Sequence, residues 1–581
     1  MKNPRSNARS TPVQYPQNLT KSLPALLSRW LGDESKDLRI LIFYGLAVGI
    51  TLLIVPISVQ ALVNTIAFGS VLQPIVILSL VVFGFLALSG LLRLNQLIVI
   101  EKIQVRLFVR TSLQIASRLT DISLEELQRN RIGSVVNRFL DIATVQKTFA
   151  YLCLEGIALA LQLITSLLLL TLYHPTFLVF SVLLALAVAL LISLPLKRGI
   201  KSAKQESQAK YEMTDFLEEL GDNHLLYRSN RLTQRVRSRV DALALNYVTA
   251  RRSHFETLRL QHAISFVLQA FFSALLLGLG GWLVVKGQLS LGQLVAAEIL
   301  ISSLLLSLTK VGKLMENLFD LVASSSKVES LLDLELERQG GLNRNLGSSP
   351  RSTGPFALEL DRVALVSGPL SKIDDISVAI HPGEAVAFTG GNGTGKSALI
   401  ELMYGLRVPS QGEIRIDGHP LRELDLASVR SEIVLVQGVQ LVDGTVLDNI
   451  RLDCDQVSLD EVRELLKEFG LDKSISFLSE GLNTQLDATR PPFSKGQLQK
   501  LMLIRALVQK PRLLLLDEAI DSIDPETKMT VIQSILRRRD QFSLIVATHS
   551  PELAARCDRS FMIQDGKLKP VQLQGAIQDE S

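Results

Sequence analysis

One short segment of this 581-residue chain has the residue types and spacing of a phosphate-binding loop. It fits the pattern G-x-x-x-x-G-K-[ST], and it lies between an apolar run at 385–388 and helix-forming residues at 398–403, the strand–loop–helix context that the motif requires. Glycines let backbone N–H groups converge on phosphate oxygens at the positive end of a helix dipole. The lysine supplies a cation for the β- and γ-phosphates, and the serine hydroxyl supplies a ligand for Mg²⁺. The segment is Gly390, Gly391, Asn392, Gly393, Thr394, Gly395, Lys396 and Ser397.

A second segment offers two adjacent carboxylates. Residues 513–518 form a fully apolar run that ends in Asp517 and Glu518, which is typical of a buried central strand that delivers acids to its carboxyl end. Asp517 would hold Mg²⁺, directly or through water, and Glu518 would act as the general base on an attacking water. The run is weak evidence alone, but it follows the phosphate-binding loop by roughly 120 residues, as a partner element of that loop does.

The elements around these motifs are predicted to form an α/β domain. From about 357 to 575 the sequence alternates short β-branched strands with helices. The fold class that follows is a C-terminal α/β P-loop NTPase domain joined to a membrane α-helical bundle, for which the evidence lies in the first half of the chain.

Long gaps between charged residues predict six transmembrane helices. No charged residue stands between Arg39 and Arg93, and because about 20 apolar residues cross a bilayer, this gap holds two spans with a turn near 68–70. The gap at 156–196 holds two more. The last two spans are predicted at 260–285 and 291–309.

The distribution of lysine and arginine predicts the orientation. The three short turns carry only Lys286, whereas the long segments at about 100–147 and 197–259 are basic and should be cytoplasmic, with both termini. We expect these segments to be helices that extend out of the membrane and return through connecting helices near 123–133 and 213–222. The alternative is a solvated charged face without a further role.

The predicted domain order is as follows. Residues 1–37 form a polar tail, with an amphipathic membrane-surface helix predicted at 19–38, and 38–330 form the transmembrane domain. Residues 331–356 form a linker, rich in Gly, Asn, Ser and Arg from 335 to 355, and 357–575 form the α/β domain.

Composition excludes several other classes of protein. A net charge of +4 without a basic patch argues against a nucleic-acid binder, and a mean hydropathy of +0.29 argues against a wholly soluble chain. Three distant cysteines support neither a disulfide framework nor a zinc site.

The motifs together resemble the nucleotide-binding domain of ATP-binding cassette (ABC) transporters, and with six spans the chain resembles exporter-type half-transporters, which include lipid, drug, peptide and type I secretion exporters. The segment 493–497 is similar to the family signature LSGGQ, Gln437 matches the Q-loop glutamine, Asp524 the D-loop aspartate and His549 the switch histidine. The resemblance implies ATP and Mg²⁺ as cofactors, Gln437 and His549 as catalytic residues, and Gln437 as a further metal ligand. It also implies nucleotide contacts from Ser494, Gly496, Gln497 and Asp524.

The sequence departs from the family pattern at three places. Ser367 stands where an aromatic residue usually stacks on adenine, Lys495 replaces a signature glycine, and 487–492 lacks the glutamate–glycine pattern often found before the signature. These departures bear on the efficiency and symmetry of hydrolysis rather than on ATP binding.

The resemblance further implies a second half-transporter as partner, in a homodimer or a heterodimer, because ATP in this family lies between two subunits. The function expected is ATP-driven export or flipping of a substrate, in an integral protein of the bacterial inner membrane with its ATPase domain in the cytoplasm. An importer of exporter architecture and a non-transporting regulatory ATPase or ATP-gated channel remain open, as does an adaptor protein. With only ~37 polar residues before the first span, no leader-peptide protease domain is expected.

Four polar residues are predicted within the spans. Glu298 lies about two turns from the outer end of its helix, where a carboxylate is costly unless it faces water or pairs within the helix. Glu155, Gln162 and Gln269 are weaker cases. Together they predict a translocation path that is not wholly apolar.

Overall fold

The structure is a computed structural model that describes residues 34–67, 72–129, 132–228, 230–343, 354–367, 371–452, 454, 456–488 and 490–571. The chain forms two compact units. The membrane unit comprises the residues up to Thr120 together with Arg129–Leu334, and the cassette unit comprises Asp121–Gln128 and the residues from Glu335 onward. The predicted polar tail, most of the amphipathic helix at 19–38 and the turn at 68–70 lie outside the described residues.

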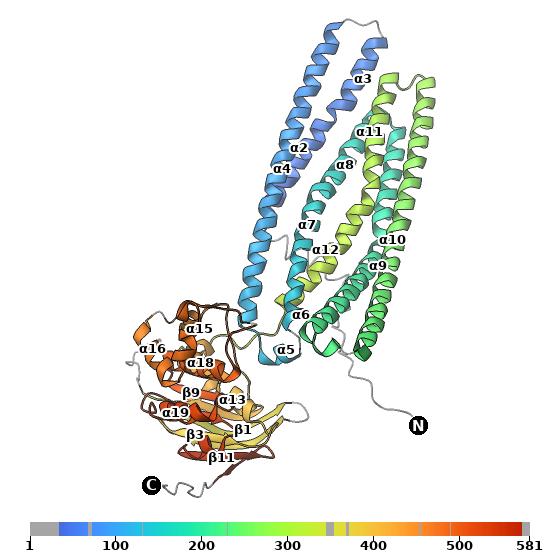
Figure 1. Cartoon of the computed structure of the whole chain (residues 1–581). Coiled ribbons are helices and arrows are strands. Elements are labelled where there is room, and N and C mark those ends of the chain that lie inside the picture. The colour runs from blue at the N-terminus through green and yellow to red at the C-terminus, as the bar shows by residue number, and fades with distance from the viewer. Residues whose placement is uncertain are drawn as a thin grey trace, which may run out of the picture. The chain divides into compact units, whose positions relative to one another are not determined.

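The membrane unit consists of long helices (Figure 1). Six helical segments among the described residues are long and apolar enough to cross a membrane, which confirms the predicted number. The helices are α2 (Ser35–Leu52), α3 (Ile54–Ala67), α4 (Leu72–Thr120), α6 (Ile132–Asn137), η1 (Arg138–Leu140), α7 (Asp141–Tyr151), η2 (Leu152–Gly156), α8 (Ile157–Tyr173), α9 (Thr176–Asp222), η3 (Leu226–Arg228), α10 (Asn230–Val285), α11 (Leu291–Thr309) and α12 (Val311–Leu332).

The helices depart from regular geometry at three places, and proline causes two of the departures. The first span breaks at Leu53, between α2 and α3, because the ring of Pro56 clashes with the carbonyl four residues earlier. In α9 Pro195 leaves the carbonyl of Leu191 without its helical donor, and the buried side chain of Gln261 on α10 donates to that oxygen at 3.4 Å. The third departure is η2, a π-helical turn within the third span.

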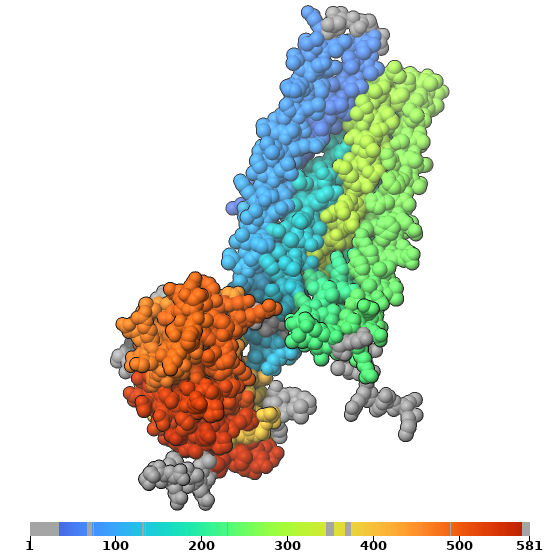
Figure 2. Space-filling model, viewed as in Figure 1, coloured from blue at the N-terminus to red at the C-terminus, as the bar shows by residue number. Residues whose placement is uncertain are grey.

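The outer surface of the membrane unit is apolar, as lipid contact requires. In the most apolar stretch of α4 only 6% of the residues are buried, and large side chains such as Ile77, Leu80 and Phe83 are exposed. Figure 2 shows α4 along one side of the unit and α10 along the other, with part of α8 visible between them. Inside, Phe180 packs edge-on against Phe272 between α9 and α10, with ring centroids 5.4 Å apart.

The helices that contain the second and fourth spans, α4 and α9, continue beyond membrane length, as predicted. The connecting helix near 123–133 is α5 (Leu124–Arg129), followed by α6. The other turn was misplaced, because 213–222 continues α9 and the chain reverses only after Asp222, at Asn223 and η3. The cause is the amphipathic pattern of 213–220, which extends the helix to its Gly–Asp–Asn end.

The cassette unit contains the predicted α/β domain. Its six-stranded sheet has the order β12-β11-β3-β10-β9-β6, with neighbouring strands parallel except at the β11–β12 edge, and a second sheet has the order β2-β1-β4-β5. The strands are β1 (Leu358–Ser367), β2 (Ser371–Ile380), β3 (Ala385–Thr389), β4 (Gln411–Ile416), β5 (His419–Pro420), β6 (Ile433–Gln437), β7 (Gly444–Thr445), β8 (Gln485–Leu486), β9 (Leu513–Asp517), β10 (Ser543–Ala547), β11 (Arg559–Gln564) and β12 (Lys567–Pro570). The helices are α13 (Lys396–Met403), α14 (Leu426–Arg430), α15 (Val446–Arg451), α16 (Leu459–Glu468), α17 (Asp472–Ser476), α18 (Lys495–Val508), α19 (Pro525–Leu536) and α20 (Pro551–Ala554), with 3₁₀ turns η5 (Leu421–Glu423) and η6 (Gly481–Asn483).

The segment after α12 differs from the predicted linker at 331–356. Its part up to 343 is hydrogen bonded: the Glu335 carbonyl accepts from Ser123 N, and Glu337 N donates to the Asp121 carbonyl. Residues 121–128 therefore belong to the cassette unit, not to the transmembrane domain predicted for 38–330. A glycine- and serine-rich composition did not reveal these backbone pairs.

Glu298 lies on α11 and is only partly buried. Its Oε1 accepts a hydrogen bond from Ser302, one turn later on the same helix, at 3.0 Å. Its Oε2 is buried without a hydrogen-bond partner among the described residues. Pairing within its own helix, the simpler of the two predicted explanations, is what the structure shows.

Candidate nucleotide site

The phosphate-binding loop joins β3 to α13, as the motif predicts. Gly395 caps the helix with φ +103°, and Gly390 has φ +147°. A Cβ on Gly390 would lie 2.9 Å from the backbone oxygen of Ile563, so only glycine fits there. The two glycines therefore allow the loop to turn tightly and expose backbone N–H groups at the start of a helix.

Lys396 lies at the centre of the loop and is only 4% exposed. Its Nζ donates to the carbonyls of Gly390 at 3.1 Å and Gly391 at 3.0 Å. It also lies 3.2 Å from His549 Nε2 and 3.9 Å from Glu518 Oε1. The ammonium group is thus held over the loop, within reach of two further predicted site residues.

The topology of the sheet brings the other predicted residues to the same edge. Strands β3, β10, β9 and β6 are parallel neighbours, so their carboxyl ends lie together. Asp517 ends β9, Gln437 ends β6, and His549 follows β10 two residues after its end.

Asp517 connects the loop to β6. Its Oδ1 accepts from the Ser397 hydroxyl at 3.1 Å and its Oδ2 from the Gln437 amide at 3.0 Å. Burial raises the pKa of this carboxyl, and the two hydrogen bonds only partly offset that effect.

These three side chains fit a Mg²⁺ ion by their chemistry. A hydroxyl, a carboxylate and an amide carbonyl are oxygen ligands of the kind that Mg²⁺ prefers. A buried carboxylate with a raised pKa gains from a cation beside it. Among the described residues no cluster of three His, Cys, Asp or Glu side chains offers another metal site.

Glu518 differs from Asp517 although the two are adjacent. It is 48% exposed, and its backbone has φ +53°, an uncommon conformation for a residue with a side chain. Its Oε1 lies 3.2 Å from His549 Nε2. This nitrogen carries either a proton or a lone pair. It can therefore donate a hydrogen bond to Glu518 or accept one from Lys396, but it cannot do both at one time.

Comparisons with known proteins agree with this geometry. The family model described as ABC transporter matches residues 373–521, and the model described as ABC transporter transmembrane region matches residues 38–308. The chain belongs to the ABC transporter family. It has the half-transporter arrangement, one membrane region followed by one cassette.

The curated relatives are bacterial. The chain is 29% identical over 294 residues to the toxin RTX-III translocation ATP-binding protein of Actinobacillus pleuropneumoniae, which covers 50% of this chain and 41% of the relative. It is 27% identical over 301 residues to the alpha-hemolysin translocation ATP-binding protein HlyB of Escherichia coli O157:H7, covering 52% and 42%. The chain thus spans less than half the length of these relatives.

A solved structure shares the fold along nearly the whole chain. It is described as a bacterial Atm1-family ABC exporter with ATP bound, and it is similar with a TM-score of 0.80 and 20% identity, covering 94% of this chain and 95% of that one.

In this ABC cassette an aspartate that the motif comparison missed holds the switch histidine. Asp521 Oδ1 accepts from the Thr548 hydroxyl at 2.7 Å, and its Oδ2 accepts from His549 N at 3.1 Å. Asp521 therefore fixes the backbone that carries the imidazole. An acid three residues after Glu518 was the available signal, but nothing in the sequence showed that it contacts the segment that follows β10.

A second missed group links the Q-loop to residues 121–128. The Gln437 amide lies 3.4 Å from Glu401 Oε1, and the Arg407 guanidinium donates to Glu401 Oε2 at 2.5 Å. Arg407 also donates to the Gln128 side chain at 3.1 Å. A continuous polar chain thus runs from Asp517 through Gln437 to α5, within the cassette unit.

The signature segment has a clear local role. Ser494 and Gln497 form a capping box at the start of α18, and the Gln497 amide also donates to Ser474 at 2.9 Å. A Cβ on Gly496 would lie 3.0 Å from the Ser522 carbonyl, so the glycine permits close packing against the D-loop. Lys495 is the first residue of α18, and Ser367 is the last of β1.

Asp524, the predicted D-loop residue, caps α19. Its side chain accepts from Thr527 N, and its Oδ1 lies 2.9 Å from the Nζ of the buried Lys500. The Thr527 hydroxyl first, and then Lys500, lower the pKa of Asp524 to about 2. The structure thus shows structural contacts for Ser494, Gln497 and Asp524, and their contact with nucleotide stays a prediction.

Proposed function

We propose that this chain is one half of an ATP-driven transporter that hydrolyses ATP in its cassette to move a substrate across, or flip it within, the membrane. One observation carries the proposal. Lys396, Asp517, Glu518 and His549 meet at the carboxyl edge of one sheet, in a chain whose other unit has six candidate spans.

The chemistry assigned to the site is phosphoryl transfer from ATP to water. The loop N–H groups and Lys396 bind the phosphates, and Ser397, Asp517 and Gln437 would hold Mg²⁺, which neutralises charge on the phosphates when bound. The water oxygen bonds to the γ-phosphorus, the bond from that phosphorus to the bridging oxygen breaks, and Glu518 accepts the water proton. ADP and phosphate are the products.

His549 would orient the γ-phosphate through its ring nitrogen, which already lies within 3.2 Å of both Lys396 and Glu518. Asp521 would keep the ring in place through the backbone. Ser494, Gly496, Gln497 and Asp524 would contact the nucleotide held by a second copy or a related half-transporter, so the active form is a dimer.

Closure of the cassettes would reach the membrane helices through α5. The segment that contains α5 is joined to the cassette by backbone bonds to Glu335 and Glu337 and by the Gln128–Arg407 hydrogen bond. ATP drives this change only if it binds the closed state more tightly than the open state.

Export or flipping is the favoured direction, in the inner membrane of a bacterium. The support is the similarity to bacterial proteins named for toxin translocation and the fold of an ABC exporter.

The test uses the full chain in lipid vesicles with the cassette facing outward. ATP hydrolysis should fall on the order of 10²–10⁴-fold in Glu518→Gln, while binding of a fluorescent ATP analogue persists, because only the base is lost. Glu464→Gln, an exposed acid on α16, is the matched control and should keep full activity. Unchanged hydrolysis in Glu518→Gln would refute the assignment of the base.

The same vesicles test direction and oligomeric state. Movement of a substrate away from the ATP side identifies export, whereas movement toward the ATP side identifies import. ATP-dependent ion currents without substrate movement identify a channel. Hydrolysis by the purified chain alone, as a dimer, supports the homodimer over the heterodimer.

A further inference from the structure

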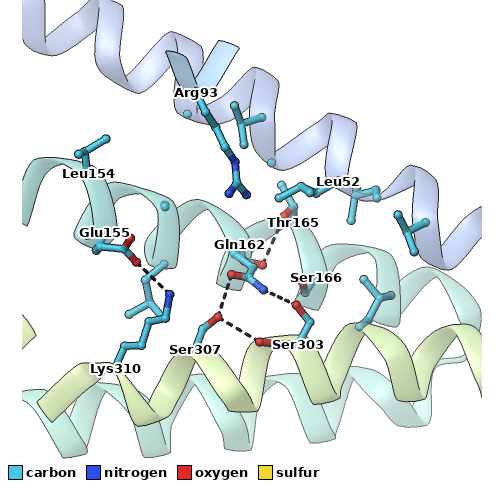
Figure 3. A pocket seen from close by; sticks show the side chains of 18 of the residues that line it. Leu52, Arg93, Leu154, Glu155, Gln162, Thr165, Ser166, Ser303, Ser307 and Lys310 are labelled. Carbon is cyan, nitrogen blue, oxygen red and sulfur yellow. Dashed lines mark hydrogen bonds and ion pairs between the residues drawn. The ribbon is translucent and has the colours of Figure 1, made fainter. Parts of the chain in front are cut away.

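The membrane unit contains a cavity of about 490 Å³ whose largely apolar lining includes several charged and polar side chains. It lies among α2, α3, α4, η2, α8, α11 and the start of α12. Arg93, Glu155 and Lys310 line it together with Gln162, Ser303 and Ser307. Figure 3 shows Arg93 reaching from the wall opposite to that of Gln162, Ser303 and Ser307. A volume of this size suits a drug-sized molecule or the head and upper chain of an amphiphile, and it excludes a folded protein.

The polar groups are sorted by depth. Counted at 1.5 Å per residue from the outer helix ends, Arg93, Glu155 and Lys310 all lie roughly 27–31 Å in, at the inner boundary of the hydrocarbon layer. Gln162 and Ser303 lie roughly 16–18 Å in by the same count, nearer the middle of the layer. Apolar residues such as Leu52 and Leu300 also line the cavity. The charged groups therefore lie toward the inner boundary and the neutral polar groups nearer the middle, while apolar residues line the cavity at both levels.

The charges of the cavity do not cancel. Lys310 pairs with Glu155 at 3.2 Å. Arg93 makes no hydrogen bond or ion pair with any residue that the structure describes. One guanidinium with five donors thus points into the cavity with no protein acceptor, and a carboxylate or phosphate is the group whose geometry it matches.

The neutral polar groups are held in place. The Gln162 amide donates to Ser303 at 2.9 Å and accepts from Ser307 at 3.0 Å, which fixes its orientation across α8 and α11 (Figure 3). Such a pair presents hydrogen-bonding groups to a ligand at low entropic cost.

Backbone irregularities lie beside the same cavity. Glu155 is on the π-helical turn η2, and π-helical turns are frequent at functional sites. Leu53 and Pro56, at the break between α2 and α3, line the facing wall. On α2, Gly45 and Gly49 let the helix approach α8, since a Cβ on Gly45 would lie 2.9 Å from Leu161 Cδ1.

We propose that this cavity binds the anionic headgroup of an amphiphilic substrate. Arg93 would pair with the anion, Gln162, Ser303 and Ser307 would make neutral polar contacts, and the apolar lining would hold the hydrocarbon part. The inference rests on the proposed transport function, because it names the class of substrate. The anion is a phosphate or a carboxylate, and the substrate is a small amphiphile rather than a polypeptide.

The test measures binding to the full chain in nanodiscs of phosphatidylcholine. The probes are dodecyl phosphate and dodecanoate, with dodecyltrimethylammonium as the cationic counterpart of the same chain length. The wild-type chain should bind at least one of the anions about tenfold or more tightly than the cation, and the ratio between the two anions distinguishes a phosphate from a carboxylate substrate. Arg93→Gln should remove that preference, and Arg93→Glu should reverse it.

The matched control is Arg39→Gln. Arg39 is an exposed cation near the inner end of α2, outside the cavity, so its loss should leave the preference intact. If Arg93→Gln and Arg39→Gln behave alike, Arg93 contacts only membrane lipids and the proposal is overturned. It is equally overturned if an acidic unstructured peptide binds in an Arg93-dependent way while neither anionic amphiphile binds.

Hydrolysis measured in the same nanodiscs separates this proposal from the proposed function. If ATP hydrolysis depends on Glu518 but the preference for anions is unchanged in Arg93→Gln, the proposed function is supported and the proposed substrate class is refuted. Absence of Glu518-dependent hydrolysis removes the function even where the anions bind.

Discussion

The nucleotide site and the membrane cavity are both polar clusters surrounded by apolar structure, yet they are built in different ways. The nucleotide site depends on backbone: glycines with positive φ, helix starts and the ends of four parallel strands. The cavity depends on side chains spaced along regular helices, with only η2 and the α2–α3 break as backbone features.

This difference explains why one site has a recognisable sequence motif and the other has none. A loop whose backbone binds phosphate allows few residues at each position, so its pattern is fixed. A helix face accepts any side chain that fits, so the identity of a cavity residue is set by its ligand and its neighbours. Substitutions should accordingly act through conformation in the cassette and through polarity or packing in the membrane unit.

Among the substitutions that test this comparison, the largest effect is expected at Gly390. Gly390→Ala forces a side chain into φ +147° and against the Ile563 carbonyl, so binding of a fluorescent ATP analogue should weaken on the order of 10–100-fold. Gly391→Ala is the control, because its Cβ would meet only the Thr394 methyl at 3.9 Å. Equal affinity in the two variants would show that the loop backbone is not the binding element.

Packing in the membrane unit is tested at Gly199. A Cβ there would lie 2.1 Å from the ring of Phe319, which is fully buried and cannot move aside, so Gly199→Ala should destabilise the unit by roughly 1–3 kcal/mol. Gly278→Ala, with no atom within 4 Å of its Cβ, should be neutral or slightly stabilising. Thermal unfolding of the detergent-solubilised chain measures both, and Phe319→Leu should rescue Gly199→Ala in part.

The link between the nucleotide site and α5 should show a smaller effect. Gln128→Leu removes the hydrogen bond from Arg407, worth about 1 kcal/mol, without changing charge. The change in hydrogen exchange at 121–128 on addition of ATP and Mg²⁺ should therefore shrink. The control Gln339→Leu removes a bond to Asp121 that does not lead to Gln437, and it should leave the change intact. Identical responses in both variants would argue against transmission along this chain of residues.

The smallest effect concerns the cap of α19. Asp524→Ala should cost about 1 kcal/mol of cassette stability, and Asp524→Asn less, since asparagine also caps helices. The pKa of Asp524 is lowered from 3.8 to about 2, so its charge stabilises the fold fully above pH ~4, and this contribution is lost as the pH falls toward 2. Thermal unfolding at pH 5, 3.5 and 2.5 should show the difference between wild type and Asp524→Asn shrinking with each step. A constant difference would mean that the ion pair with Lys500 contributes nothing.

The sequence-based predictions were correct where local residue types determine the structure and wrong where contacts between distant residues determine it. The strand at 385–388, the loop and the helix after it were correct because local residue types determine them, and the six spans were correct because bilayer thickness sets their length. The turn at 213–222 was misplaced because an amphipathic helix leaves no local sign of where it stops short of a glycine. The linker was misjudged because its backbone pairs are with residues far away in the sequence, such as Glu335 with Ser123 and Leu342 with Glu423.

By itself the sequence determined the family, the order of the domains and the chemistry offered by Lys396, Asp517 and Glu518, since phosphate binding and membrane crossing restrict residue types over short windows. Only the tertiary structure decided that Asp521 holds His549, that Arg407 joins Glu401 to Gln128, and that Arg93 faces Gln162 across a cavity. Each of these relations joins residues from different elements, and a contact between distant segments depends on how helices and strands pack, which no local pattern records.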